Sequence, residues 1–205
     1  MSNTLFNMFK YLILTLIILI IFISVFFIPT INSESIIINS NEIGEIEINP
    51  TSGFAWPTPG YTRINSPYGK RNSPTAGASS FHKGIDIGAP EGSYFIAVTS
   101  GTITYEGFLG GGGYTITITA DEDLIPNNTL KISYCHCNPN FLVKEGEHVS
   151  TGQVIGKVGP KNVYGVPGNQ YTDSDGNPTN GATTGPHLHL GMRLNGEYIN
   201  PMNFY

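Results

Sequence analysis

The most apolar part of the chain is residues 11–28, which contain no charged side chain. A helix that is apolar on every side needs a non-aqueous environment, and about 20 such residues span a bilayer. Lys10 precedes this run and the next basic residue is Arg63, so the positive-inside rule places the N-terminus in the cytoplasm. We therefore predict a cytoplasmic segment at 1–10, a single-pass transmembrane signal anchor at 11–28, and an extracytoplasmic domain attached to the cell membrane.

A cleaved signal peptide is the alternative to an anchor. Its apolar region is normally shorter, and it ends at a small-x-small cleavage site, a pattern that does not follow Ile28. The anchor is therefore the favoured interpretation.

Residues 29–53 are predicted to form a linker rich in Asn, Ser and Glu, in which the alternating Ile46 and Ile48 are compatible with an edge strand. From Phe54 onward, short alternating segments are separated by Gly and Pro, the pattern of β-strands joined by turns. The clearest segments lie at 94–98, 102–105, 114–119 and 130–137. We predict an all-β domain over 54–205, which contains a weak repeat that begins at Glu91-Gly92 and again at Glu145-Gly146.

Charge and cysteine content narrow the class of protein. The formal net charge is -5 and no basic patch stands out along the sequence, which argues against nucleic acid as a partner. Two cysteines are too few for a disulfide scaffold.

The most informative motif is Gly185-Pro186-His187-Leu188-His189-Leu190. Side chains alternate across a strand, so His187 and His189 point to the same side. Two imidazoles on one face are typical of a transition-metal site, although each could instead be a strand residue with a hydrogen-bond partner.

A second motif runs from Phe81 through His82-Lys83-Gly84-Ile85-Asp86-Ile87. Its glycines argue against a helix. As an extended segment it places His82, Gly84 and Asp86 on one face, where Gly84 leaves room for an ion. Phe81, Ile85 and Ile87 are expected on the opposite face.

Two further segments are interpreted more conservatively. In the strand around Cys135-His136-Cys137, alternation predicts both thiols on one face, as small buried hydrophobic groups, and His136 on the other. Asp173 begins a calcium-like loop that lacks the acidic twelfth residue, so a turn is favoured there. The long polar loop 160–184 is expected to form a wall of a substrate groove.

A catalytic zinc site usually has three protein ligands and one open position. His82, Asp86 and one histidine of the 187/189 pair could supply the ligands. The remaining histidines of the strand-like segments are then available for proton transfer, because no His-Glu-x-x-His motif provides a glutamate base.

Together, the His-x-x-x-Asp, Tyr-x-His and Gly-Pro-His-x-His motifs make residues 54–205 resemble the lysostaphin-type (LytM-like) zinc endopeptidases of bacterial cell walls. The resemblance implies a β-sandwich or barrel of duplicated-hybrid-motif type and a Zn2+ ion held by His82, Asp86 and His189. It further implies that His136 acts as base and His187 stabilises the oxyanion. The segment Tyr68 to Arg71 matches the family's Tyr/Phe-Gly-x-Arg pattern, which we interpret as structural.

We therefore expect a membrane-anchored zinc metalloendopeptidase that hydrolyses stem or cross-bridge peptides of peptidoglycan. The alternatives are a non-catalytic wall-binding or regulatory module of the same fold, and a component of a secretion or conjugation machine that opens the wall locally. The sequence makes no prediction of oligomeric state.

Overall fold

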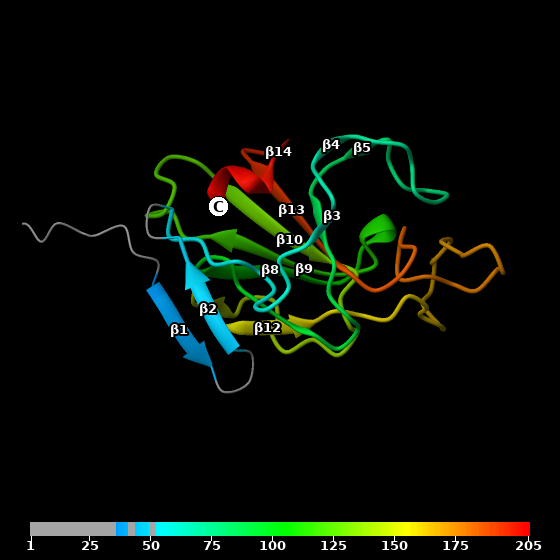
Figure 1. Ribbon diagram of the computed structural model, residues 1–205, viewed down its shortest axis with the longest axis horizontal. Coiled ribbons are helices and arrows are strands. Elements are labelled where there is room, and N and C mark those ends of the chain that lie inside the picture. Colours follow the sequence, from blue (N-terminus) through cyan, green and yellow to red (C-terminus); the bar gives the residue numbers. More distant parts are fainter. Residues whose placement is uncertain (1–35, 41–43, 50–51) are drawn as a thin grey trace, which may run out of the picture. The chain divides into compact units, whose positions relative to one another are not determined.

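Short strands and tight turns dominate the computed structural model, which describes residues 36–40, 44–49 and 52–205 (Figure 1). Within these ranges the only helical segments are two single turns of 3-10 helix, η1 (Gly110–Gly112) and η2 (Pro201–Phe204). The prediction of a mostly β domain is confirmed.

The predicted membrane anchor at 11–28 lies outside the described residues, as does the cytoplasmic segment 1–10. In the part of the chain that the structure covers, no helix combines the length and apolar character needed to cross a membrane.

The largest sheet has eight strands, and every pairing in it is antiparallel. The strand order is β11-β8-β9-β10-β13-β6-β3, and β14 pairs with β13 beside this path. The bounds are β3 Ile64–Ser66, β6 Ile85–Ile87, β8 Gly101–Phe108, β9 Tyr114–Ala120, β10 Leu130–Cys135, β11 His148–Val149, β13 Leu188–Leu194 and β14 Glu197–Ile199.

Three two-stranded sheets complete the regular structure of the described ranges. They pair β7 (Tyr94–Ile96) with β12 (Val154–Lys157), β4 (Gly69–Lys70) with β5 (Phe81–His82), and β1 (Ile36–Ser40) with β2 (Gly44–Ile48). The β1–β2 hairpin lies in the segment predicted to be a linker.

The weak sequence repeat has a structural counterpart. The first copy contains β7 and the start of β8, and the second contains β11 and β12. The copies pair crosswise, β7 with β12 and β8 with β11. Each begins at a turn whose glycine has a positive φ, +83° at Gly92 and +85° at Gly146, a conformation that favours glycine.

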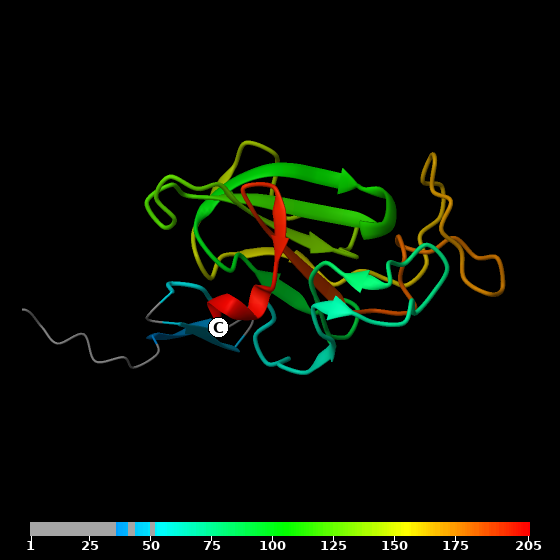
Figure 2. The ribbon, with the colours of Figure 1, turned by 90° about the horizontal axis from the view of Figure 1, so that it is seen from above.

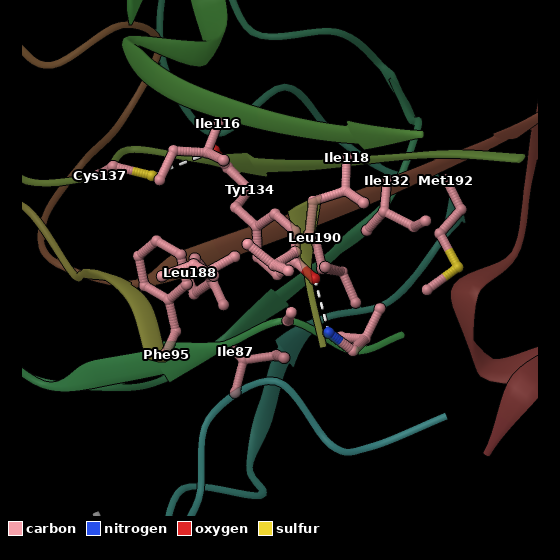
Figure 3. Close-up of a cluster of buried hydrophobic side chains, with 14 of the residues drawn as sticks. Ile87, Phe95, Ile116, Ile118, Ile132, Tyr134, Cys137, Leu188, Leu190 and Met192 are labelled. Carbon is pink, nitrogen blue, oxygen red and sulfur yellow. Dashed lines mark hydrogen bonds between the residues drawn. The ribbon is translucent and has the colours of Figure 1, made fainter. Parts of the chain in front are cut away.

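The core lies between one face of the large sheet and the β7–β12 pair (Figure 3). Phe95 of β7 stacks on Tyr134 of β10 with ring centroids 5.3 Å apart. The buried Tyr134 hydroxyl accepts a hydrogen bond of 2.8 Å from the Val98 amide, so its polar end is satisfied. Around these rings, β-branched and aliphatic side chains from alternate positions fill the layer: Ile87, Ile116, Ile118, Ile132, Leu188, Leu190 and Met192.

Candidate active site

His82 and Asp86 reach the site from β5 and β6, which are joined by the bend at Lys83-Gly84. His82 is buried, with 2% of its side chain exposed, and Asp86 projects from β6 on the face opposite the core residues Ile85 and Ile87. The expected position of Phe81 beside these isoleucines was wrong. The chain turns after β5, so Phe81 is 39% exposed and lines the groove with His82.

His187 and His189 enter from the start of β13. His189 lies directly opposite Asp86 in the register of β13 and β6. Nε2 of His187 is 3.4 Å, and Nδ1 of His189 is 2.8 Å, from Oδ1 of Asp86. The prediction that both imidazoles point the same way is confirmed.

Three atoms that could each bind a metal ion converge in this cluster: Nε2 of His82, Oδ1 of Asp86 and Nδ1 of His189. Their separations are 2.9 Å between the two nitrogens, and 3.1 and 2.8 Å from the carboxylate oxygen to His82 and His189. In a tetrahedral zinc site with bonds of about 2.0–2.2 Å, neighbouring ligand atoms lie roughly 3.3 Å apart. Two imidazoles and one carboxylate at this spacing fit a zinc ion.

The second nitrogen of His82 is fixed as well. Its Nδ1–H donates to the carbonyl oxygen of Pro67 at 2.8 Å, so Nε2 is the ring nitrogen that faces Asp86 and His189. The packing around position 84 requires a residue without a Cβ. A Cβ at this position would lie 2.3 Å from the Leu190 carbonyl oxygen and 2.8 Å from Nε2 of His189.

Arg71 and Ser66 support the cluster, which the sequence interpretation did not foresee. Nη1 of Arg71 donates to Oδ2 of Asp86 at 3.0 Å and to the Ser66 hydroxyl at 2.6 Å. The guanidinium therefore holds the carboxylate oxygen that faces away from the two imidazoles. The Tyr/Phe-Gly-x-Arg pattern was the available signal, but interpreting it as structural placed Arg71 outside the site.

His136 occupies an unusual backbone conformation at the end of β10, with φ of +60°. Its N–H donates to the Gly112 carbonyl at 2.8 Å, and its own carbonyl accepts from Gly159 at 2.9 Å. Strand alternation stops at this residue. The prediction that the two cysteines share a face was therefore wrong: Cys135 lines the groove together with His136, whereas Cys137 lies in the core with Tyr134. Both thiols are free and buried, as expected.

His136 and His187 face each other with ring centroids 4.7 Å apart. Nδ1–H of His136 donates to the carbonyl oxygen of Asn180 at 2.7 Å, and Nδ1–H of His187 donates to that of Gly185 at 2.8 Å. In each ring Nδ1 is therefore occupied by a hydrogen bond to a backbone carbonyl oxygen, and Nε2 is the nitrogen available to a ligand.

Asn180 was also missed by sequence reasoning. It is fully buried and joins the long loop to the sheet. Its side chain accepts from the Tyr114 amide at 2.8 Å and donates to the Cys137 carbonyl at 2.9 Å. An asparagine in a polar loop carries no pattern that would indicate this position.

Burial and mutual contact set the charges of the cluster. Burial alone raises the pKa of the Asp86 carboxyl, but hydrogen bonds from His187, His189 and His82 outweigh it and hold that pKa well below its usual range. Burial lowers the pKa of His136 to about 3, and the nearby His187 and His189 add to this effect. Burial also lowers the pKa of His189, against the opposing effect of Asp86. The cluster therefore holds an ionised carboxylate, and burial disfavours the charged forms of His136 and His189.

Loops frame the groove around these side chains. The groove is lined by residues of loop 71–80, of η1 and of segment 182–187. The ring of Tyr171, from loop 160–184, lies against Gly77 and Gly111 and so brings the three walls together. Figures 1 and 2 show loops 71–80 and 160–184 projecting at the same end of the large sheet.

Two polar features lie outside the groove lining. His148 is 58% exposed and pairs with Asp121 at 3.0 Å. The carboxylate of Asp173 binds Lys161 at 2.9 Å and accepts from the backbone amides of its own turn, so the interpretation as a turn is confirmed.

Comparison with known proteins places this site in a family. The model for peptidase family M23 matches residues 80–201, more than half of the chain. Over 143 residues the chain is 35% identical to the DD-carboxypeptidase/endopeptidase Mpg of Neisseria meningitidis serogroup B, covering 70% of this chain and 27% of that protein. Over 142 residues it is 29% identical to the peptidoglycan DD-endopeptidase ShyC of Vibrio cholerae, covering 69% of this chain and 27% of that protein. The chain thus spans 27% of the length of these curated relatives.

The fold is similar to that of the catalytic domain of the antimicrobial peptidase lysostaphin from Staphylococcus simulans. The TM-score is 0.52 at 26% sequence identity, over 70% of this chain and 91% of that domain. The family match includes all five clustered side chains, in the order His82, Asp86, His136, His187 and His189. The chain belongs to peptidase family M23.

Proposed function

We propose that this protein is a membrane-anchored zinc metalloendopeptidase that hydrolyses peptide bonds in the stem or cross-bridge peptides of peptidoglycan. The observation that carries the proposal is the convergence of three metal-binding donor atoms and two further imidazoles in one groove. Similarity to relatives described as a DD-carboxypeptidase/endopeptidase and as a peptidoglycan DD-endopeptidase supports this class of substrate.

His82, Asp86 and His189 would hold the zinc ion. When bound, zinc supplies a Lewis acid that acidifies water and polarises a carbonyl group. Three protein ligands leave one position open for these groups, the pattern of catalytic rather than structural zinc. Pro67 and Arg71 orient two of the ligands through the contacts described above.

His136 acts as the base. The Asn180 carbonyl binds its Nδ1–H, so the free lone pair is on Nε2, and burial keeps the ring neutral at working pH. Nε2 can accept a proton from the attacking water and pass it to the leaving amine.

His187 stabilises the oxyanion. Its Nδ1–H is held by the Gly185 carbonyl, so in the doubly protonated ring the hydrogen on Nε2 is free to be donated to the developing negative charge of the scissile carbonyl oxygen. The ring pair is 4.7 Å apart between centroids, close enough for both histidines to act on one peptide bond.

The membrane-spanning role of residues 11–28 belongs to the same proposal. The absence of charge in this run and the basic residue before it support an extracytoplasmic domain on a single-pass anchor. Such an anchor would hold the groove near the wall.

The test uses the 205-residue chain, purified in detergent, with purified peptidoglycan. Release of new amino termini and bound zinc are measured for wild type, His189→Ala and His187→Ala. We expect cleavage by wild type alone, with zinc lost in His189→Ala and kept in His187→Ala. His148→Ala, which alters an exposed histidine outside the groove lining, serves as the control and should behave like wild type.

Other outcomes have defined meanings. Zinc binding without cleavage of walls from several bacterial types would favour the wall-binding or regulatory alternative. Failure of wild type to bind zinc would rule out the proposed site.

A further inference from the structure

The floor of the groove continues along the large sheet beyond the histidines. His189, Gly191 and Arg193 occupy alternate positions of β13 and therefore share the face that bears the site. The neighbouring strand β10 adds the residues that pair with them, namely Cys135, Ser133 and Lys131. Ser133 in turn hydrogen-bonds Thr117 of β9, with 3.2 Å between the hydroxyl oxygens. These positions form a strip of mostly small residues that runs from the site to two basic side chains, Lys131 and Arg193.

Basic side chains gather where this strip ends. The Lys83 ammonium is 4.8 Å, and the Arg193 guanidinium carbon 4.9 Å, from the centre of the Tyr198 ring. Lys83 and Tyr198 both line the groove. We call Lys83, Arg193 and Tyr198 the basic end.

The charges of the basic end lack an acidic partner. Among the described residues, neither Lys83 nor Arg193 forms an ion pair with a carboxylate. The Tyr198 ring attracts both cations through its electron-rich face but carries no charge of its own. Two uncompensated cations on a chain of net charge -5 are therefore available to an anionic ligand.

The charge of Arg193 also acts on the groove itself. Burial raises the pKa of the Cys135 thiol to about 11, and the positive charge of Arg193 opposes this rise. Cys135 lines the groove next to His136, so Arg193 belongs to the electrostatic environment of the site.

We propose that the basic end binds a carboxylate of the peptide substrate. The inference rests on the proposed function and specifies its substrate class: peptides with a free carboxylate rather than uncharged chains such as oligoglycine. From His189 to Arg193 the strand advances four residues, about 13 Å at 3.3 Å per residue. An extended peptide covers a similar length per residue, so the recognised carboxylate lies about three to four residues from the scissile bond.

Binding rather than cleavage provides the decisive measurement. Dye-labelled stem peptides purified from peptidoglycan are used with their carboxyl groups free, or converted to amides with carbodiimide and ammonium. Affinity is measured by fluorescence anisotropy on the zinc-loaded 205-residue His187→Ala chain in detergent, so that no turnover intervenes. We expect the free carboxyl form to bind on the order of tenfold more tightly, and this difference to shrink at high salt.

The variants isolate the basic end. Lys83→Gln combined with Arg193→Gln should abolish the preference for the carboxyl form. Lys157→Gln is the matched control, because Lys157 lies 4.6 Å from the centre of the Tyr94 ring in a similar contact but outside the groove lining, and it should keep the preference. Urea midpoints of all variants establish that they are folded.

Equal affinity for both peptide forms, binding of neither, or a preference that survives in the double variant would each overturn the inference. These results are distinct from failure of the proposed function. If the wild-type enzyme cleaves both forms equally, the proposed function is supported and the inference about the basic end is wrong. If the chain prefers the carboxyl form but never cleaves, the inference is supported and the proposed function is wrong.

Discussion

At the scale of single residues, the site depends on backbone positions as much as on the side chains that carry chemistry. His136 has a left-handed backbone conformation, which costs energy for a residue with a Cβ. Hydrogen bonds to Gly112, Gly159 and Asn180 hold it there. The conformation turns the His136 imidazole into the groove. Regular alternation along β10 would have placed only Cys135 there and would have sent His136 to the opposite face.

Gly84 offers the sharpest test of close packing around the proposed ligands. Gly84→Ala places a Cβ against the Leu190 carbonyl and the His189 ring, so we expect a loss of about 1–3 kcal/mol in the free energy of unfolding and weaker zinc binding. Urea unfolding and zinc titration against a chelator measure the two effects. Gly185→Ala, where a Cβ meets no atom within 4 Å, should leave stability unchanged. Equal stability of the two variants would contradict the packing argument.

The buried His136 ring predicts a pH dependence of stability in the metal-free protein. Its folded pKa is about 3 and its unfolded value is about 6.5. Below pH 6.5 the unfolded chain binds a proton that the folded ring does not, so the free energy of unfolding falls as pH falls toward 3. The expected loss from this residue is roughly 2 kcal/mol between pH 7 and pH 5.

Urea unfolding in the presence of EDTA at pH 7 and pH 5 measures this loss. The His136→Gln variant should show a smaller decrease than wild type, because it lacks the titrating group. An identical decrease in both proteins would show that His136 is not the source.

At the scale of elements, the site is an intersection of strands that are distant in sequence. The β4–β5 hairpin brings His82, and Arg71 follows β4; β6 brings Asp86, and β13 brings His189. The pairing of β6 with β13 sets Asp86 directly opposite His189. Arg71 then links the hairpin to β6 through the Asp86 carboxylate. The metal-binding geometry is therefore a property of how these elements dock.

Arg71→Lys tests that docking. A lysine ammonium keeps the charge, but it sits on a flexible stem and replaces the rigid guanidinium whose Nη1 contacts both Ser66 and Asp86. We expect zinc affinity to fall by about 10- to 100-fold, measured by competition with a chromophoric chelator. Arg63→Lys, which changes an exposed arginine, is the control. Unchanged zinc affinity in Arg71→Lys would assign the arginine a purely structural role.

At the scale of the whole molecule, charge is distributed unevenly with respect to the groove. The chain is acidic, yet Lys83 and Arg193 flank the groove without acidic partners in the described part of the chain. Long-range attraction would draw anionic peptides to this surface and would be screened by salt.

The apolar run at 11–28 predicts how the protein is retained in the cell. In a bacterial host we expect the chain to stay in the membrane fraction after an alkaline wash, at its full 205-residue mass. Replacing Leu16 and Leu19 with arginine should release it from that fraction, because each charge costs about 3 kcal/mol at the centre of a membrane helix. A conservative Leu19→Val change should not. A mature protein that begins after residue 28 would instead support the cleaved signal peptide.

The sequence by itself determined the strand-rich character and the identity of the clustered residues. Alternation places Ile116 and Ile118 in the core and sends His187 and His189 to one face, because side-chain direction along a regular strand follows from the backbone alone. Alternation also placed His82 and Asp86 on one face of an extended segment, and the family resemblance indicated both as zinc ligands.

Only the tertiary structure decided the features that break local regularity or join distant segments. The turn after β5 exposes Phe81. The left-handed His136 separates Cys135 from Cys137, an outcome that depends on hydrogen bonds to segments elsewhere in the chain. Arg71, Asn180 and the basic end became visible for the same reason. Their importance lies in atoms brought within a few ångströms across long sequence separations, and no local pattern encodes such a contact.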